Sequence, residues 1–64
     1  MKMMIIVNYY NGTSETINAE DILIDDDSCD IGTETPVIRP EEPDRPVVGF
    51  GINTKEIKKL EITF

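Results

Sequence analysis

The sequence predicts an all-β domain, a small, strongly bent barrel or β-roll of five strands. The strongest indication is residues 3–17, where an apolar run reaches an Asn-Gly pair and a polar, β-prone run follows, as in a hairpin. Short apolar runs at residues 22–24, 47–52 and 58–64 supply three more strands. The 64 residues allow one domain with a marginal core, because such a chain buries only about 60% of its unfolded surface.

The first strand is expected at residues 3–10, with apolar side chains on both faces over most of its length. This pattern predicts a central strand that is covered on both faces, or one that uses one face as an interface. The turn after it allows two registers. A two-residue loop would pair Tyr10 with Thr13, whereas a three-residue loop, with Gly12 in the left-handed conformation, would pair Tyr9 with Thr13. The sequence Tyr-Asn-Gly-Thr favours the second register.

The later strands are expected at residues 13–18, 22–24, 47–52 and 58–64, and residues 53–57 have the pattern of one capped helical turn. The alternation of apolar residues within these strands indicates which side chains point inward. The predicted core comprises Ile5, Val7, Ile17, Ile22, Ile24, Val48, Phe50, Ile52, Ile57, Leu60, Ile62 and Phe64.

A helical turn directly before a final strand, capped by either Asn53 or Thr54, resembles the layout of small SH3-like and Sm-like barrels. The resemblance concerns architecture alone and implies no functional residues. It rests on the spacing of Ile52, Ile57, Leu60 and Ile62.

Residues 25–46 are expected to form a long, acidic loop stiffened by proline. Three consecutive aspartates disfavour a strand, and proline cannot donate a hydrogen bond to a central ladder. The segment contains four prolines, which are Pro36, Pro40, Pro43 and Pro46.

The charge is concentrated in one part of the chain. Residues 1–19 are neutral, residues 20–44 carry −9, and residues 45–64 carry +2, which gives the net charge of −7. Such a field repels nucleic acid and anionic membranes, so neither is an expected partner. The single cysteine, Cys29, cannot form an internal disulfide, and no secretory signal or apolar run of about 20 residues is visible. These observations favour a cytoplasmic protein.

Catalysis is not expected, because the chain has no histidine and the acids around Cys29 disfavour its thiolate. No cofactor is predicted. The oxygen-rich stretch at residues 25–30 would suit Ca²⁺ or Mg²⁺, but Ile31 and Val37 stand where an EF-hand needs glycine and glutamate. No metal ligand is therefore predicted, and cation binding stays an alternative.

The acidic residues are the expected contact surface for a protein partner with a basic surface. Alternate aspartates of an extended chain lie about 6.6 Å apart, close to the phosphate spacing of a nucleic-acid strand. A phage-type or mobile-element-type inhibitor that blocks a nucleic-acid-handling host protein is the function that this pattern favours. The predicted contact residues are Asp25, Asp26, Asp27, Asp30, Glu34, Glu41, Glu42 and Asp44.

Two further interaction surfaces are possible. Prolines that recur every three residues lie along one edge of a polyproline II helix, which either binds an SH3-type groove or serves as a stiff linker. This edge comprises Arg39, Pro40, Pro43, Arg45 and Pro46. The second apolar face of the first strand predicts self-association, with a homodimer as one form, through Met4, Ile6 and Tyr10.

Overall fold

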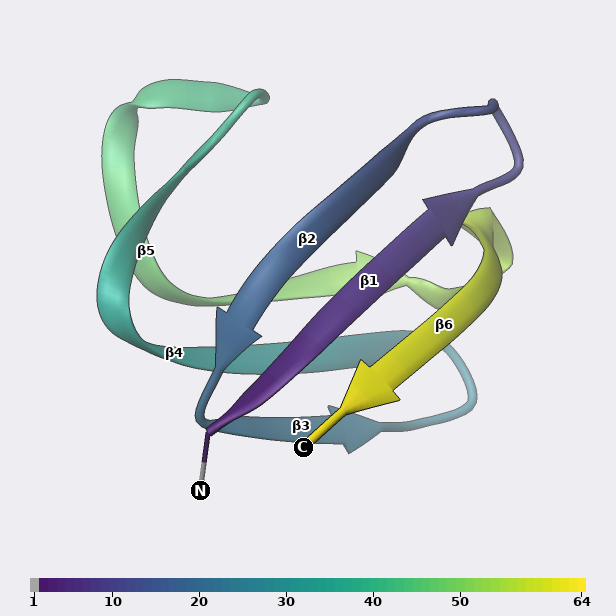
Figure 1. Ribbon diagram of the computed structural model, residues 1–64. Helices are drawn as coiled ribbons and strands as arrows, with labels where there is room; N and C mark the ends of the chain where they lie inside the picture. The colour runs from purple at the N-terminus through teal and green to yellow at the C-terminus, as the bar shows by residue number, and fades with distance from the viewer. Residues whose placement is uncertain (1) are drawn as a thin grey trace.

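The chain forms two three-stranded antiparallel sheets in a computed structural model that describes residues 2–64 (Figure 1). The first sheet has the order β2-β1-β6, from β1 (Met3–Tyr9), β2 (Ser14–Ala19) and β6 (Ile57–Thr63). The second has the order β3-β4-β5, from β3 (Asp21–Ile24), β4 (Ser28–Arg39) and β5 (Glu42–Asn53). The all-β prediction is confirmed, but there are six strands in the described residues and not five.

The β1–β2 turn adopts the three-residue loop. Gly12 has a φ of +90°, and the Tyr9 backbone N–H donates to the Thr13 carbonyl at 2.9 Å. Ile5 lies opposite Ile17 in the resulting ladder. The predicted Tyr9–Thr13 register is confirmed, and it places both isoleucines on the inner face of the first sheet.

Replacing Gly12 with alanine is expected to destabilise the fold by about 1–2 kcal/mol, because a side chain makes the left-handed conformation costly. A Cβ at this position meets nothing within 4 Å, so the cost is conformational and not steric. Gly12→Asn is the matched control, since asparagine tolerates this region better. Urea unfolding of both variants measures the difference, and an alanine variant as stable as the wild type would contradict the assigned turn.

Two short connections carry the chain between the sheets. Glu20 alone separates β2 from β3, and its backbone N–H donates to the Gly32 carbonyl at 2.8 Å. The 3₁₀ helix η1 (Thr54–Glu56) returns the chain from β5 to β6. The Asn53 side chain caps it by accepting from the Lys55 N–H at 2.9 Å. The predicted capped turn before the final strand is therefore confirmed, with Asn53 as the cap.

Residues 25–46 do not form the predicted long loop, since most of them belong to β4 and β5. Beside β3, strand β4 alternates regularly: Cys29 and Ile31 are about 1% exposed, whereas Asp30 points outward. This period of two is a strand signal. The prediction missed this strand because the neighbouring acids and prolines are poor strand formers.

The prolines lie where the β4–β5 ladder is interrupted. Pro36 falls in the register break between Gly32 and Val37 of β4. Pro43 and Pro46 lie between Glu42 and Val47, which are the β5 partners of Arg39 and Val37, and the register breaks there as well. At these positions the missing N–H of proline does not cost the ladder a hydrogen bond. Beyond Gly32, residues 33–48 form a two-stranded arm that curls away from the second sheet (Figure 1).

The core differs from the prediction mainly at edge strands. Ile5, Val7, Ile17 and Ile52 are buried as predicted, and Ile22, Phe50, Ile57 and Leu60 pack against them. Four predicted core residues are exposed: Ile24 (57%), Val48 (57%), Ile62 (38%) and Phe64 (82%). Ile24 and Ile62 lie on edge strands, and Val48 lies at a register break, so the opposite sheet covers them poorly. The prediction omitted the buried residues Ala19, Cys29 and Ile31.

Strand β1 is central in its sheet, as predicted, but only its inner face is covered. Met4 on the outer face is 45% exposed, and Ile6 beside it is half-buried. Within residues 2–64, the fold includes no helix that is both long and apolar enough to cross a membrane.

Candidate functional site

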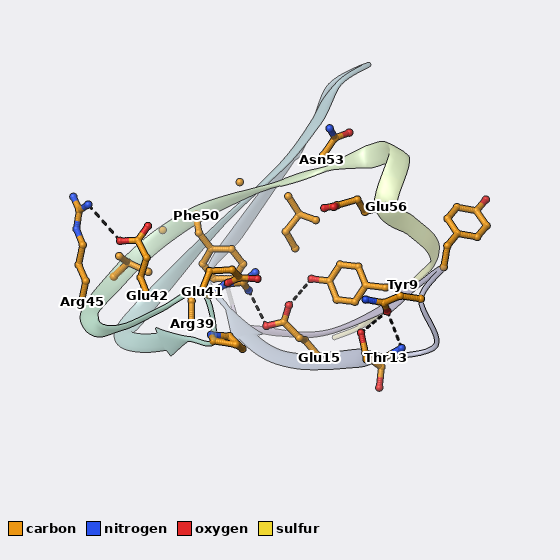
Figure 2. Close-up of a pocket in the computed structure, with 18 residues that line it drawn as sticks. Tyr9, Thr13, Glu15, Arg39, Glu41, Glu42, Arg45, Phe50, Asn53 and Glu56 are labelled. Carbon is orange, nitrogen blue, oxygen red and sulfur yellow. Dashed lines mark hydrogen bonds and ion pairs between the residues drawn. The ribbon is translucent and has the colours of Figure 1, made fainter.

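An open groove of about 890 Å³ lies between β5, the tip of the arm and the β1–β2 turn (Figure 2). Its lining comes from three segments, within residues 9–15, 39–45 and 47–53, together with Glu56 of η1. These segments are distant in the sequence, and the hairpin turn, the arm and the corner before β6 bring them together. The groove is therefore a candidate binding site of the described part of the chain.

The wall of the groove contains an ion pair with aromatic contacts on both sides (Figure 2). The Arg39 Nη1 lies 2.8 Å from a Glu15 carboxylate oxygen, and its guanidinium stacks 3.9 Å from the centroid of the Phe50 ring. The Tyr9 hydroxyl donates to the other Glu15 oxygen. Arg39 Nε also lies 3.5 Å from Glu41. Since the Arg39 side chain is only 13% exposed, this cluster holds the arm against the first sheet.

The cluster raises the pKa of Tyr9 to about 12, chiefly because the phenol is buried and secondarily because it donates to Glu15. Above pH 10 the unfolded chain loses this proton while the folded protein keeps it. The stability that is fully present below pH 10 is therefore expected to fall as the pH rises toward 12. Urea unfolding at about pH 9 and about pH 11 measures this loss. Tyr9→Phe is the control, and an equally steep decline in that variant would contradict the assignment.

The groove is acidic overall, with four glutamates against two arginines among its lining residues. Arg39 is engaged by Glu15 and Glu41, and Arg45 lies 3.5 Å from Glu42. The fourth glutamate, Glu56, has no side-chain partner within residues 2–64. Its side chain points into the space between β5 and Tyr9 (Figure 2).

The predicted partner-binding acids are all exposed, but they do not lie on one loop. One group occupies the β3–β4 turn and the start of β4, and another occupies the arm tip, at the opposite end of the β4–β5 hairpin (Figure 1). Glu34 lies between them, 3.7 Å from Lys2. The first group is Asp25, Asp26, Asp27 and Asp30, and the second is Glu41, Glu42 and Asp44.

The β3–β4 turn is an ordered structure. The Asp25 N–H donates to the Ser28 carbonyl at 2.8 Å and closes the turn. The Thr54 hydroxyl donates to the Asp26 carbonyl at 2.9 Å, and the Thr54 N–H donates to the Asp27 carbonyl at 3.1 Å. No group of three or more histidine, cysteine, aspartate or glutamate side chains within residues 2–64 could hold a metal ion. The turn therefore directs its carboxylates into solvent.

The predicted polyproline edge does not form a continuous helix. The chain reverses at residues 40–41, so Arg39 and Pro40 are separated from Pro43, Arg45 and Pro46, which belong to β5. Arg39 turns inward because its ion pair and its contact with Phe50 hold it there.

The predicted self-association residues are also divided. Met4 and Ile6 share the outer face of β1, whereas Tyr10, 69% exposed, lies in the turn and lines the groove.

Cys29 is a buried free thiol. Burial raises its pKa most, and the charge of Asp30 raises it further. The predicted direction is confirmed, but the main cause is burial and not the neighbouring acids.

Sequence reasoning missed the groove residues Tyr9, Glu15 and Phe50. The three-residue turn offered one signal, since its register places Tyr9 and Glu15 as diagonal neighbours on one face.

Comparison of the chain with protein-family models, with curated proteins and with solved structures finds no match.

Proposed function

We propose that this chain is a small acidic protein-binding module that engages a partner with a basic surface. The observation that carries the proposal is the display of the acids: all eight predicted contact residues are exposed, and they lie on the β3–β4 turn and on β4, β5 and the turn that joins them. Fixed charges of one sign steer a basic partner and orient it before contact. Because the backbone that carries the acids is already held in place, little backbone ordering entropy opposes binding.

The proposed partner is a nucleic-acid-handling protein in the cytoplasm of the host, which the module would inhibit in the manner of a phage or mobile-element product. The net charge of −7 supports this target class, since such proteins carry basic surfaces that bind phosphates. The two acidic groups at opposite ends of the β4–β5 hairpin would contact separate basic patches on the partner.

We also propose that the architecture is an SH3-like or Sm-like barrel. Only Glu20 separates β2 from β3. Counting them as one strand bent at this corner reduces six strands to five, with η1 before the last. The two sheets would then share that bent strand.

Self-association is the second candidate function, because Met4 is 45% exposed on the outer face of a central strand. A homodimer through this face would cover Met4 and Ile6. Light scattering across a wide concentration range tests it, and a monomer throughout that range would remove this candidate.

Capture from a bacterial lysate tests the proposed function. A tagged protein is washed at low and then at high salt, and bound proteins are identified by mass spectrometry. Two neutralised variants separate the acidic groups. The first carries Asp25→Asn, Asp26→Asn, Asp27→Asn and Asp30→Asn, and the second carries Glu41→Gln, Glu42→Gln and Asp44→Asn. We expect one basic protein that elutes with salt and is captured less by at least one variant. Recovery of the bait alone, or capture unchanged in both variants, would overturn the proposal.

A further inference from the structure

We propose that the groove beside β5 binds an extended segment of the partner, rich in lysine or arginine, as an added β-strand. The inference rests on the proposed function, because it takes the partner to be basic, and it assigns the site and mode of binding. Three observations carry it: the open edge of β5, the charge of the groove, and the exposed aromatic side chain beside it.

The backbone edge of β5 is open to the groove. Strand β5 is the last strand in the order β3-β4-β5, and no other strand of residues 2–64 pairs with its far edge. The consecutive residues 49–53 all line the groove, although they alternate between the two faces of the sheet. A groove lined by both faces of one strand runs along its edge. Unpaired N–H and C=O groups on such an edge can pair with an incoming extended chain.

The charges around this edge select a cationic occupant. Two arginines in the lining are already paired with glutamates, while the Glu56 carboxylate has no partner among the described residues and points into the groove. The Tyr10 ring, 69% exposed in the lining, provides a surface for the aliphatic stem or the charged end of lysine or arginine. A second copy of this chain fits less well, because each copy carries −7.

The test uses a capped eight-residue peptide of alternating lysine and valine. Its control carries N-methyl groups on two adjacent central residues, which keeps the charge but removes one hydrogen-bond donor from each edge of the peptide. Fluorescence anisotropy at low salt measures affinity, and amide chemical shifts locate the contact. We expect the unmethylated peptide to bind about fivefold more tightly, because one backbone hydrogen bond to β5 is lost at a cost of about 1 kcal/mol. The largest shifts should fall in residues 49–53.

Two protein variants with the same charge change locate the electrostatic contribution. Glu56→Lys alters the groove, whereas Asp25→Lys alters the exposed β3–β4 turn, whose residues do not line the groove. We expect Glu56→Lys to weaken peptide binding several-fold more than Asp25→Lys. Equal weakening would mean that only the overall field attracts the peptide, which would overturn the groove as the site.

The remaining outcomes separate this inference from the proposed function. Equal binding of both peptides, with shifts at the acidic turn or the arm tip, would overturn strand addition and leave a basic partner in place. Failure of both peptides to bind would overturn the inference, while lysate capture would still decide the proposed function. A concentration-dependent dimer whose shifts follow the β5 edge would overturn it as well, with a second copy as the occupant.

Discussion

Ile31→Ala is expected to destabilise the protein by about 2–5 kcal/mol, because it leaves a cavity in a closely packed core. The Ile31 side chain is 1% exposed, and it lies on β4 between Ile22 of β3 and Phe50 of β5. A domain of this length has a total stability of roughly 3–10 kcal/mol, so much of the population would unfold near physiological temperature. Thermal and urea unfolding, followed by far-UV circular dichroism, measure the loss.

The matched control for this substitution is Ile38→Ala. Ile38 lies on the same strand and is the same residue type, but it is 66% exposed in the arm. Its replacement is expected to change the stability by no more than about 0.5 kcal/mol. Similar effects at the two positions would show that β4 is not a core strand.

Arg39→Met is expected to cost about 2–3 kcal/mol, since it removes a charge-assisted hydrogen bond and a cation–π contact while keeping the aliphatic stem. Glu15, 26% exposed, then retains only the Tyr9 hydroxyl as a hydrogen-bond donor to its carboxylate among the described contacts. The arm also loses its closest ion pair with the first sheet. Unfolding in urea gives the total cost, and amide exchange in residues 33–48 reports whether the arm loosens.

Arg45→Met provides the comparison for Arg39. Its guanidinium lies 3.5 Å from Glu42, and its side chain is 76% exposed, so the loss should be about 0–1 kcal/mol. A double variant, Arg39→Met with Glu15→Gln, removes the uncompensated carboxylate and should recover part of the stability. If Arg39→Met is as mild as Arg45→Met, the cluster does not hold the arm.

The sequence was sufficient for features that depend on local chemistry. The Asn-Gly pair indicated the hairpin turn, and the sequence Tyr-Asn-Gly-Thr favoured the Tyr9–Thr13 register. The oxygen-bearing side chains of Asn53 and Thr54 indicated a capped turn, and Asn53 supplies the cap of η1. Such features follow from the backbone and capping preferences of a few adjacent residues.

The sequence was insufficient where long-range pairing decides the structure. The acids and prolines of residues 25–46 are poor strand formers, yet Cys29 and Ile31 bury their side chains, and that burial outweighs the unfavourable propensities of their neighbours. Arg39 was assigned to a surface edge, because nothing local indicates that Glu15 and Phe50 lie beside it. The groove was missed for the same reason, since three distant segments build it.

The β4–β5 hairpin and the β3–β4 turn before it position the acidic groups, and the hairpin also forms one side of the groove. Native-state amide hydrogen exchange, resolved by residue, tests this arrangement most directly. Residues 29–32 of β4 lie between two strands, so their amides should exchange only when the whole domain unfolds. The amides of Asp26 and Asp27 in the exposed turn should exchange much faster. Exchange of all residues 25–46 at the rate of an unprotected chain would contradict the hairpin, and with it both the display of the acids and the site beside β5.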